Sequence, residues 1–165
     1  MSFGIDSMHR RVHAFVLALV VLGCQAKPAG RDAYSGEPVR AAIHSNCTAE
    51  LVDERGYACV QVDVFAEGEG PPAARGEWLT LHYIVEIDDE QLDSSHAGKP
   101  LSLKLHESSD MIEGLHLGVE GMRVGERRRV VIPPKLGYRG KKLAGVPPDA
   151  NLVFFVELVG RRETP

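Results

Sequence analysis

The fold class is decided by residues 111–138, MIEGLHLGVEGMRVGERRRVVIPPKLGY. Met111, Leu115 and Val119 recur every four residues, which predicts a short helix with one apolar face. The residues that can cap its N-terminus are Ser108, Ser109 and Asp110. Residues 127–132 predict a strand, which the two prolines that follow it must end.

The rest of the body adds only strands. Alternating apolar and polar residues predict strands within the segments 60–64, 79–87, 101–105 and 152–158. One short helix among several alternating strands predicts an α+β fold with an antiparallel sheet packed on the helix. We expect Arg127–Arg129 to lie on a solvated edge strand. A turn is expected over residues 88–91.

Composition restricts the function classes. The chain has 165 residues, of which 44% are hydrophobic and 25% are charged, an ordinary balance for one soluble domain with an appendage. This excludes multi-span membrane proteins and collagen-like repeats. A net charge of −4 argues against a nucleic-acid partner, which favours a basic excess. Only 6% of residues are aromatic, so a pocket must be built mostly from aliphatic side chains.

Residues 1–23 have the features of a secretory leader. Arg10 and Arg11 precede the apolar run Ala14–Leu22, which is too short for a bilayer span of about 20 residues. The run ends in Leu22-Gly23-Cys24, which resembles the lipobox of bacterial lipoproteins. The resemblance implies cleavage before Cys24 and lipidation of that cysteine. An ordinary signal peptide that is cut elsewhere is the alternative.

The segment after the leader, residues 24–40, contains Pro, Gly, Ser and charged residues without a period, which predicts a flexible tether. The expected location is the periplasmic side of the cell envelope, anchored by lipid to the outer membrane. Contact with the membrane is expected through the lipid anchor only.

Residues 41–75 form an extension before the main domain. Cys47 and Cys59 flank an apparent turn, so in an oxidising compartment they would staple a hairpin near its base. Two free core cysteines are the alternative. Such a bridge would contribute about 3 kcal/mol by restricting the unfolded chain.

The body lacks the sequence signatures of common catalytic chemistry. It has neither a phosphate-binding loop nor a Gly-x-Ser-x-Gly elbow. Its histidines have no metal-ligand spacing, and no metal is expected: His82, His96, His106 and His116. What remains is a pocket between a sheet face, a helix edge and a Pro/Gly-rich loop.

Residues 76–162 resemble the FKBP-type peptidyl-prolyl cis-trans isomerase domain. The stretches that carry the resemblance follow in order: Leu81-His-Tyr83, Leu92-Asp-Ser-Ser95, Lys99-Pro-Leu101, Met111-Ile-Glu-Gly-Leu115, Gly121-Met-Arg-Val-Gly-Glu126, Ile132-Pro-Pro-Lys-Leu-Gly-Tyr138 and Val146-Pro-Pro-Asp-Ala-Asn-Leu-Val-Phe154. The resemblance implies an FKBP-like half-barrel antiparallel sheet wrapped around one short helix. It also implies isomerisation of Xaa-Pro bonds without a cofactor, with proline-containing polypeptides as partners. Together with the secretory leader, it predicts a role in the folding of cell-envelope proteins.

The resemblance also implies a set of site residues. The catalytic set is Tyr83, Asp93, Ile112, Tyr138 and Phe154. The substrate-binding set is Leu92, Leu101, Met111, Leu115 and Val146. In this scheme Tyr83 and Asp93 pair on the pocket wall, while the Ile112 N–H and the Tyr138 hydroxyl donate to a substrate carbonyl.

Three aliphatic residues depart from the family pattern. Leu115 replaces the usual floor Trp, and Leu92 and Leu101 stand where Phe is common. Each lost ring contact removes about 0.5–1.5 kcal/mol of binding. We therefore expect a weak to moderate isomerase that binds macrolide inhibitors weakly. A non-catalytic chaperone or peptide-binding domain with a degenerate pocket is the alternative.

Overall fold

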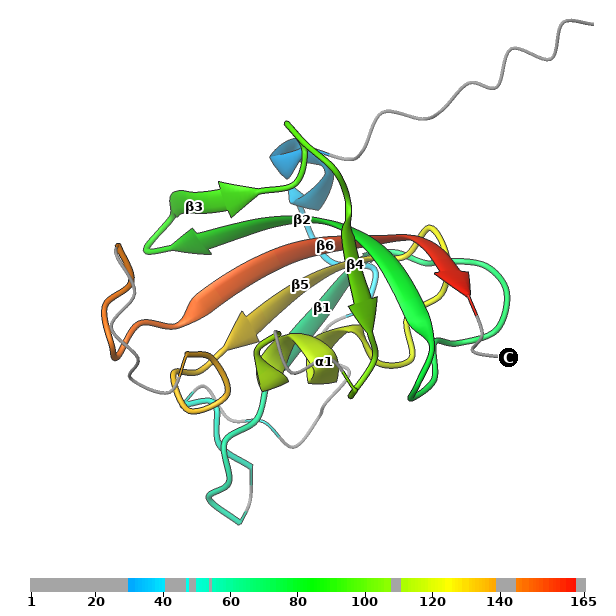
Figure 1. The fold of residues 1–165 in the computed structure, drawn as a ribbon. Helices are drawn as coiled ribbons and strands as arrows, with labels where there is room; N and C mark the ends of the chain where they lie inside the picture. The colour runs from blue at the N-terminus through cyan, green and yellow to red at the C-terminus, as the bar shows by residue number, and fades with distance from the viewer. Residues whose placement is uncertain are drawn as a thin grey trace, which may run out of the picture.

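The computed structural model describes residues 30–40, 47, 50–53, 55–107, 111–138 and 145–162. Within them, six antiparallel strands form one sheet and a single α-helix lies across one of its faces, which confirms the expected α+β class (Figure 1). The elements are a 3-10 helix η1 (Arg31–Tyr34), strands β1 (Gln61–Ala66), β2 (Trp78–Ile87), β3 (Glu90–Ser94) and β4 (Leu101–Lys104), helix α1 (Glu113–Val119), and strands β5 (Arg127–Ile132) and β6 (Leu152–Arg162).

The long strand β2 organises the sheet. The strand order is β1-β5-β6-β2-β3, and β4 also pairs with β2. The first half of β2 pairs with β4 and its second half pairs with β3, so both short strands lie on the same side of it. Its register with β6 shifts between Thr80 and Leu81, and its register with β3 shifts between Val85 and Glu86. Such bulges bend a strand, and β2 curves visibly (Figure 1).

Packing holds α1 against β5. Leu115 and Val119 of the helix are fully buried in the core. A Cβ atom at Gly114 would lie 2.2 Å from Ile132 Cγ2, and one at Gly118 would lie 2.4 Å from a methyl of Val130. These two glycines therefore let the helix approach the strand more closely than any side chain allows, which offsets their poor helix propensity.

The helix begins later than the sequence predicts. Its N-cap is Ile112, with φ −68° and ψ 143°, and no side chain caps it. The expected caps, residues 108–110, lie outside the described residues. Instead the N–H of Gly114 donates to the carbonyl of Leu136 at 2.8 Å, which ties the helix start to the turn after β5.

The face of the sheet opposite α1 is partly covered by the chain before β1. Tyr34 of η1 is buried, with its ring centroid 5.2 Å from that of Phe155. The Arg31 guanidinium lies 3.9 Å above the Phe155 ring and donates to Glu86 at 3.0 Å. The flexible-tether prediction for residues 24–40 is therefore wrong over η1, because Tyr34 gains burial by docking there.

The solvated-edge prediction for Arg127–Arg129 is also wrong. Strand β5 lies between β1 and β6, and Arg128 is buried. Arg128 donates to Glu126 at 2.7 Å and, at 2.9 Å each, to the carbonyls of Gly118 and Glu120. The charge is thus paired, and it also caps the C-terminal end of α1.

The extension carries the expected disulfide. Cys47 and Cys59 are bridged, with their Cα atoms 5.9 Å apart. Val52 and Ala58 form an antiparallel bridge, and the N–H of Cys59 donates to the carbonyl of Leu51. The stapled hairpin is anchored because Leu51 is buried and Ala58 packs against the main core.

Strand β3 was not expected. Asp88 and Asp89 have φ of 50° and 65°, so the turn takes only two residues, and a two-residue turn of this kind joins antiparallel strands tightly. Residues Glu90–Ser94 then pair with the end of β2. Most of β3 is exposed, so it shows no apolar alternation in the sequence.

Candidate functional site

Most of the predicted site residues surround one part of the main core. Phe154 and Leu115 belong to the core itself, with 5% and 0% of their surface exposed. Six others are half-buried and pack against that core: Tyr83, Leu101, Met111, Ile112, Tyr138 and Val146. They come from β2, β4, the start of α1, the turn after β5 and the segment before β6. The sheet and the helix together thus present an apolar, partly open surface.

Tyr83 and Asp93 form the expected polar pair. The Tyr83 hydroxyl donates to an Asp93 carboxylate oxygen at 2.6 Å, across the β2–β3 ladder. Burial, and then the hydrogen bond to Asp93, raise the pKa of Tyr83 to about 12. Tyr83 therefore stays a neutral donor at physiological pH, and the carboxylate places negative charge at the edge of the apolar surface.

Phe154 lies beside this pair. Val85 is the cross-strand partner of Phe154, two residues beyond Tyr83 on the same face of β2. The ring centroids of Tyr83 and Phe154 are 6.1 Å apart and the rings are tilted by 42°. The two rings therefore form one aromatic wall at the junction of β2 and β6.

Ile112 presents a main-chain donor. It is the N-cap of α1, so its N–H precedes the helical hydrogen bonds. Within the described part of the chain, no hydrogen bond occupies that N–H. The link from Gly114 to Leu136 fixes the backbone two residues further on. The arrangement fits the expected role of Ile112 as a donor to a carbonyl group.

Tyr138 brings a second hydroxyl to the same place. Burial, and then the negative charge of Asp93, raise the pKa of Tyr138. The negative charge of Asp93 thus acts on the hydroxyls of both Tyr83 and Tyr138. Val146 packs nearby on the core, beyond residues 139–144, which lie outside the described part.

Leu92 and Leu115, both predicted to bind substrate, do not lie on the inner surface of the site. Leu92 is 37% exposed on β3, and its Cδ1 atom would lie 3.6 Å from a Cβ at Gly145. It therefore forms an outer wall against the segment that leads to Val146. Leu115 has no exposed surface, so it supports the site from below rather than offering a surface to a ligand.

A second polar cluster lies behind Tyr83, and no sequence pattern predicted it. Ser95 is buried, and its hydroxyl accepts the Tyr83 N–H at 2.8 Å. The same hydroxyl lies 3.1 Å from His82 Nδ1. Serine after aspartate usually indicates only a turn. The cluster depends on a register between β2 and β3 that the sequence does not show.

Two other site predictions concern a metal and Cys24. Among residues of the described ranges, no group of three or more His, Cys, Asp or Glu side chains could hold a metal ion. Cys24 lies outside the described residues, so its lipidation stays a prediction.

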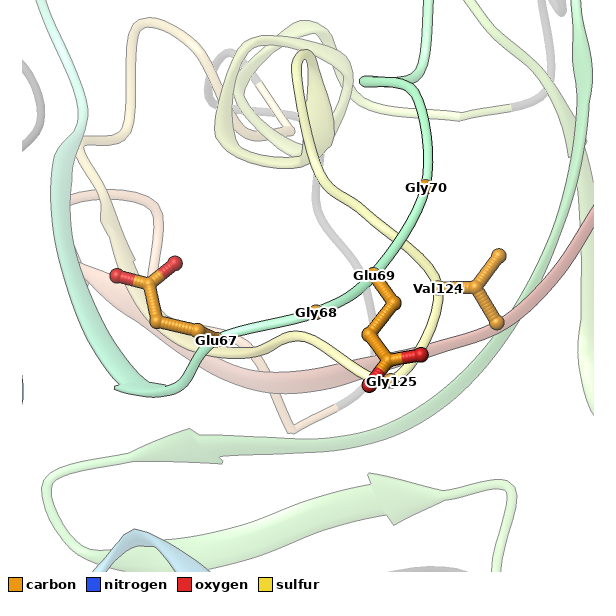
Figure 2. Close-up of a pocket in the computed structure, with 6 residues that line it drawn as sticks. All are labelled: Glu67, Gly68, Glu69, Gly70, Val124 and Gly125. Atoms are coloured by element: carbon orange, nitrogen blue, oxygen red, sulfur yellow. The ribbon is translucent and has the colours of Figure 1, made fainter.

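A shallow hollow lies elsewhere on the surface, between the segment after β1 and the turn before β5 (Figure 2). Its lining is Glu67, Gly68, Glu69, Gly70, Val124 and Gly125, none of which belongs to the predicted site. The Glu69 N–H donates to the carbonyl of Val124, which holds the two segments together. The hollow therefore lies where these two hydrogen-bonded loops meet.

The arrangement suits binding of a neutral, partly apolar group with a carbonyl. The aliphatic and aromatic surface excludes water from a small ring, while the Ile112 N–H and the Tyr138 hydroxyl supply hydrogen-bond donors. The described site residues include no serine, cysteine or histidine placed as a nucleophile. Any chemistry here must therefore act through shape, polarity and hydrogen bonding.

Comparisons with known proteins point to one family. A family model described as FKBP-type peptidyl-prolyl cis-trans isomerase matches residues 70–159. "FK506-binding protein 4" of Aspergillus oryzae is 35% identical over 126 residues, covering 76% of this chain and 26% of that protein. "FK506-binding protein 3" of Candida albicans is 41% identical over 93 residues, 56% of this chain and 22% of that protein. The chain thus spans about a quarter of the length of these curated relatives.

Solved structures share the fold. FkpA from Escherichia coli superposes with a TM-score of 0.59 at 28% identity, over 69% of this chain and 52% of that one. The N-terminal domain of FKBP42 from Arabidopsis thaliana gives a TM-score of 0.58 at 29% identity, over 63% of this chain and 87% of that one. The expected FKBP-like architecture is confirmed.

Proposed function

Because this chain belongs to the FKBP-type peptidyl-prolyl cis-trans isomerase family, we propose that it catalyses cis-trans isomerisation of Xaa-Pro peptide bonds. The observation that carries the proposal is the half-buried apolar surface that joins Tyr83, Phe154 and Tyr138 around the carboxylate of Asp93. The substrates are proline-containing polypeptides. No cofactor takes part in the proposed reaction.

The mechanism follows from the electronic structure of the amide. Rotation about the X–Pro bond must overcome a barrier of about 18–20 kcal/mol, because the planar bond has partial double-bond character. The twisted amide loses resonance, and its carbonyl dipole shrinks. An apolar surface therefore favours the twisted state over the planar one, and complementarity to the twisted shape adds to this preference.

Each site residue has a place in this scheme. Phe154 and Val146 contact the prolyl ring, which buries it away from water. The Ile112 N–H and the Tyr138 hydroxyl hold the neighbouring carbonyl while the bond rotates. Asp93 fixes the Tyr83 hydroxyl and sets the local field. Rotation transfers no proton, so no residue here needs to act as an acid or a base.

The aliphatic replacements lower the expected activity. Leu101 is half-buried and Leu92 lies on the outer wall, so both offer less ring contact than aromatic side chains would. Each lost ring contact costs about 0.5–1.5 kcal/mol of substrate or transition-state binding. A macrolide inhibitor that depends on the same contacts would bind weakly.

Export and lipid anchoring belong to the same proposal. The leader-like residues 1–23 and the Leu22-Gly23-Cys24 sequence favour a lipoprotein of the cell envelope, which assists folding of envelope proteins. The Cys47–Cys59 disulfide supports an oxidising compartment. In the described residues no helix is long and apolar enough to cross a bilayer. Labelled palmitate should be incorporated by the expressed chain and lost in Cys24→Ala, and retention in that variant would contradict anchoring at Cys24.

A non-catalytic peptide-binding domain is the second candidate. It is favoured by Leu115, which is fully buried and so does not offer the ring surface that the family usually has there. The two candidates differ in one measurement. A binding domain would show shift changes at Tyr83 and Ile112 on addition of a prolyl peptide without faster isomerisation, whereas an isomerase would show both.

A direct activity test uses refolding of a protein whose slow phase is limited by proline isomerisation. The chain should increase the rate of that phase in proportion to its concentration. Phe154→Ala should abolish most of the increase, while His106→Gln should leave it unchanged, because the His106 ring contacts Glu120 at the end of α1 and none of the described site residues. A rate equal to background with the folded chain would refute the proposed activity.

A further inference from the structure

The backbone of Tyr83 is held by a second hydrogen-bond network besides the bond from its hydroxyl to Asp93. Strand β3 ends at Ser94, so the β2–β3 ladder stops just short of Tyr83. Ser95 takes the place of a strand partner there. Its hydroxyl accepts the Tyr83 N–H at 2.8 Å, and its own N–H donates to the Tyr83 carbonyl at 3.0 Å.

The same short segment holds Asp93. One Asp93 carboxylate oxygen accepts the Tyr83 hydroxyl, and the other accepts the Ser94 N–H at 2.7 Å. The Ser94 hydroxyl donates to the Tyr83 carbonyl at 3.3 Å. The position of the Asp93 carboxylate is therefore coupled to the residues that follow it, and not only to the strand that contains it.

Two histidines complete the network from the other face of the sheet. His82 precedes Tyr83, so its side chain points to the opposite face. His82 Nδ1 lies 3.1 Å from Ser95 Oγ, and His96 Nδ1 lies 3.2 Å from Ser94 Oγ. The two ring centroids are 5.5 Å apart. Each ring thus touches one of the two serines that hold Tyr83, and His96 Nδ1 also lies 3.3 Å from the Tyr83 carbonyl oxygen.

We propose that His82, Ser95 and His96 form a clasp that positions the Tyr83–Asp93 pair, and that protonation of both histidines opens it. The inference rests on the proposed isomerase activity, and it adds three positioning residues and a pH dependence to it. None of the three contacts the substrate in this scheme. They act through the backbone of Tyr83 and through the segment that carries Asp93.

The surrounding charges determine the direction of the effect. Burial, and then the nearby His96, lower the pKa of His82 below its ordinary value, whereas Glu157 opposes that shift. Glu157 is the cross-strand partner of His82 on β6, and Arg127 of β5 pairs with Glu157 in register from its far side. The His82 ring is therefore neutral at neutral pH, and a positive charge on it would repel a positive charge on the His96 ring 5.5 Å away.

The repulsion would separate the loop that begins at Ser95 from β2. Opening withdraws the Ser95 hydroxyl from the Tyr83 N–H and loosens the segment that holds Asp93. We therefore expect kcat/KM for an Xaa-Pro peptide to fall as the pH decreases from about 8 to 5, the range in which histidine changes charge.

Three variants of the full chain separate positioning from general stability. His96→Gln removes the like charge, so the fall in kcat/KM at acid pH should disappear. Ser95→Ala should lower kcat/KM by about tenfold at neutral pH, where the clasp is closed, because a small misplacement of site groups has effects of that order. Ser95→Thr should restore most of the loss.

A matched control uses the second histidine pair. His106 and His116 have centroids 5.4 Å apart, and His106 contacts Glu120 rather than the clasp. In His106→Gln, kcat/KM should therefore fall at acid pH as it does in the parent chain. The amide shifts of Tyr83 and Asp93, followed by NMR across the same pH range, supply a readout that does not depend on activity.

The outcomes are distinct. The clasp predicts that the Tyr83 and Asp93 amides shift with the midpoint of the His82 ring in the parent and in His106→Gln, but not in His96→Gln. The inference would be overturned if the Tyr83 and Asp93 amide shifts of the parent did not follow the His82 titration. It would also be overturned if kcat/KM of His96→Gln still fell at acid pH. Coupled amide shifts without any isomerisation would confirm the clasp and refute the proposed function.

Discussion

Replacing Gly114 with alanine is the most specific perturbation of the contact between α1 and the sheet. The added methyl group would lie 2.2 Å from Ile132 Cγ2, with two more Ile132 atoms at 3.2 Å. Carbon atoms prefer separations of about 3.5–4.0 Å, so the helix start or Ile132 must move by roughly 1.5 Å. The helix start carries Ile112, so the N–H that we propose binds the substrate moves with it.

The magnitudes follow from opposing effects. Overpacking a core costs about 1–3 kcal/mol, whereas alanine in a helix interior gains about 0.5–1 kcal/mol over glycine. We therefore expect Gly114→Ala to lower the free energy of unfolding by about 1–2 kcal/mol. A displacement of this size at Ile112 should lower kcat/KM by about tenfold to a hundredfold.

Urea unfolding and kcat/KM for one Xaa-Pro peptide measure both effects. Gly98→Ala is the matched control, because a Cβ there meets nothing within 4 Å. Adding Ile132→Ala to Gly114→Ala should cost less stability than the sum of the two single changes, since the new methyl fills part of the space that Ile132 vacates. A Gly114→Ala chain as stable and as active as the parent would refute the close-approach argument.

Three further predictions concern stability and pH. Arg128→Met should lower the free energy of unfolding by about 3 kcal/mol, because it removes the nearest cation, itself buried, from beside the buried Glu126 and leaves the Arg40 guanidinium 3.9 Å away, and adding Glu126→Leu should recover part of that loss in urea unfolding. Reducing the Cys47–Cys59 disulfide should lower stability by about 3 kcal/mol in the same assay, and a chain with both cysteines changed to alanine should not respond to reductant. Because the pKa of Tyr83 is raised to about 12, kcat/KM should stay flat from about pH 8 to 10. Above the ordinary tyrosine value the unfolded chain loses its proton first, so stability should fall as the pH rises further, and ultraviolet titration of Tyr83→Phe against the parent checks the assignment.

The local sequence pattern was sufficient to predict the helix and the strands that bury one face in the core. The alternation from Leu79 to Ile87 predicted β2, and the spacing of Leu115 and Val119 predicted α1. Ordered motifs that resemble the FKBP domain then predicted how these elements assemble. The Tyr83–Asp93 pair was predicted through that resemblance and is present in the structure.

Features that depend on tertiary packing were not predictable in the same way. Strand β3 is exposed on most of its length, so it shows no period, and composition alone made residues 31–34 look like a tether. Periodicity also does not reveal which strand is central, which is why buried Arg128 was expected at a solvated edge. The clasp behind Tyr83 likewise requires the β2–β3 register.

The central claim is tested most directly by NMR exchange on a short Xaa-Pro peptide, with the disulfide-bonded chain compared with Asp93→Ala and Phe154→Ala. The account predicts cis-trans exchange well above background for the parent and a clear loss in both variants, each of which must keep a folded spectrum. Exchange at the background rate for a folded parent chain, or unchanged exchange in both variants, would contradict it.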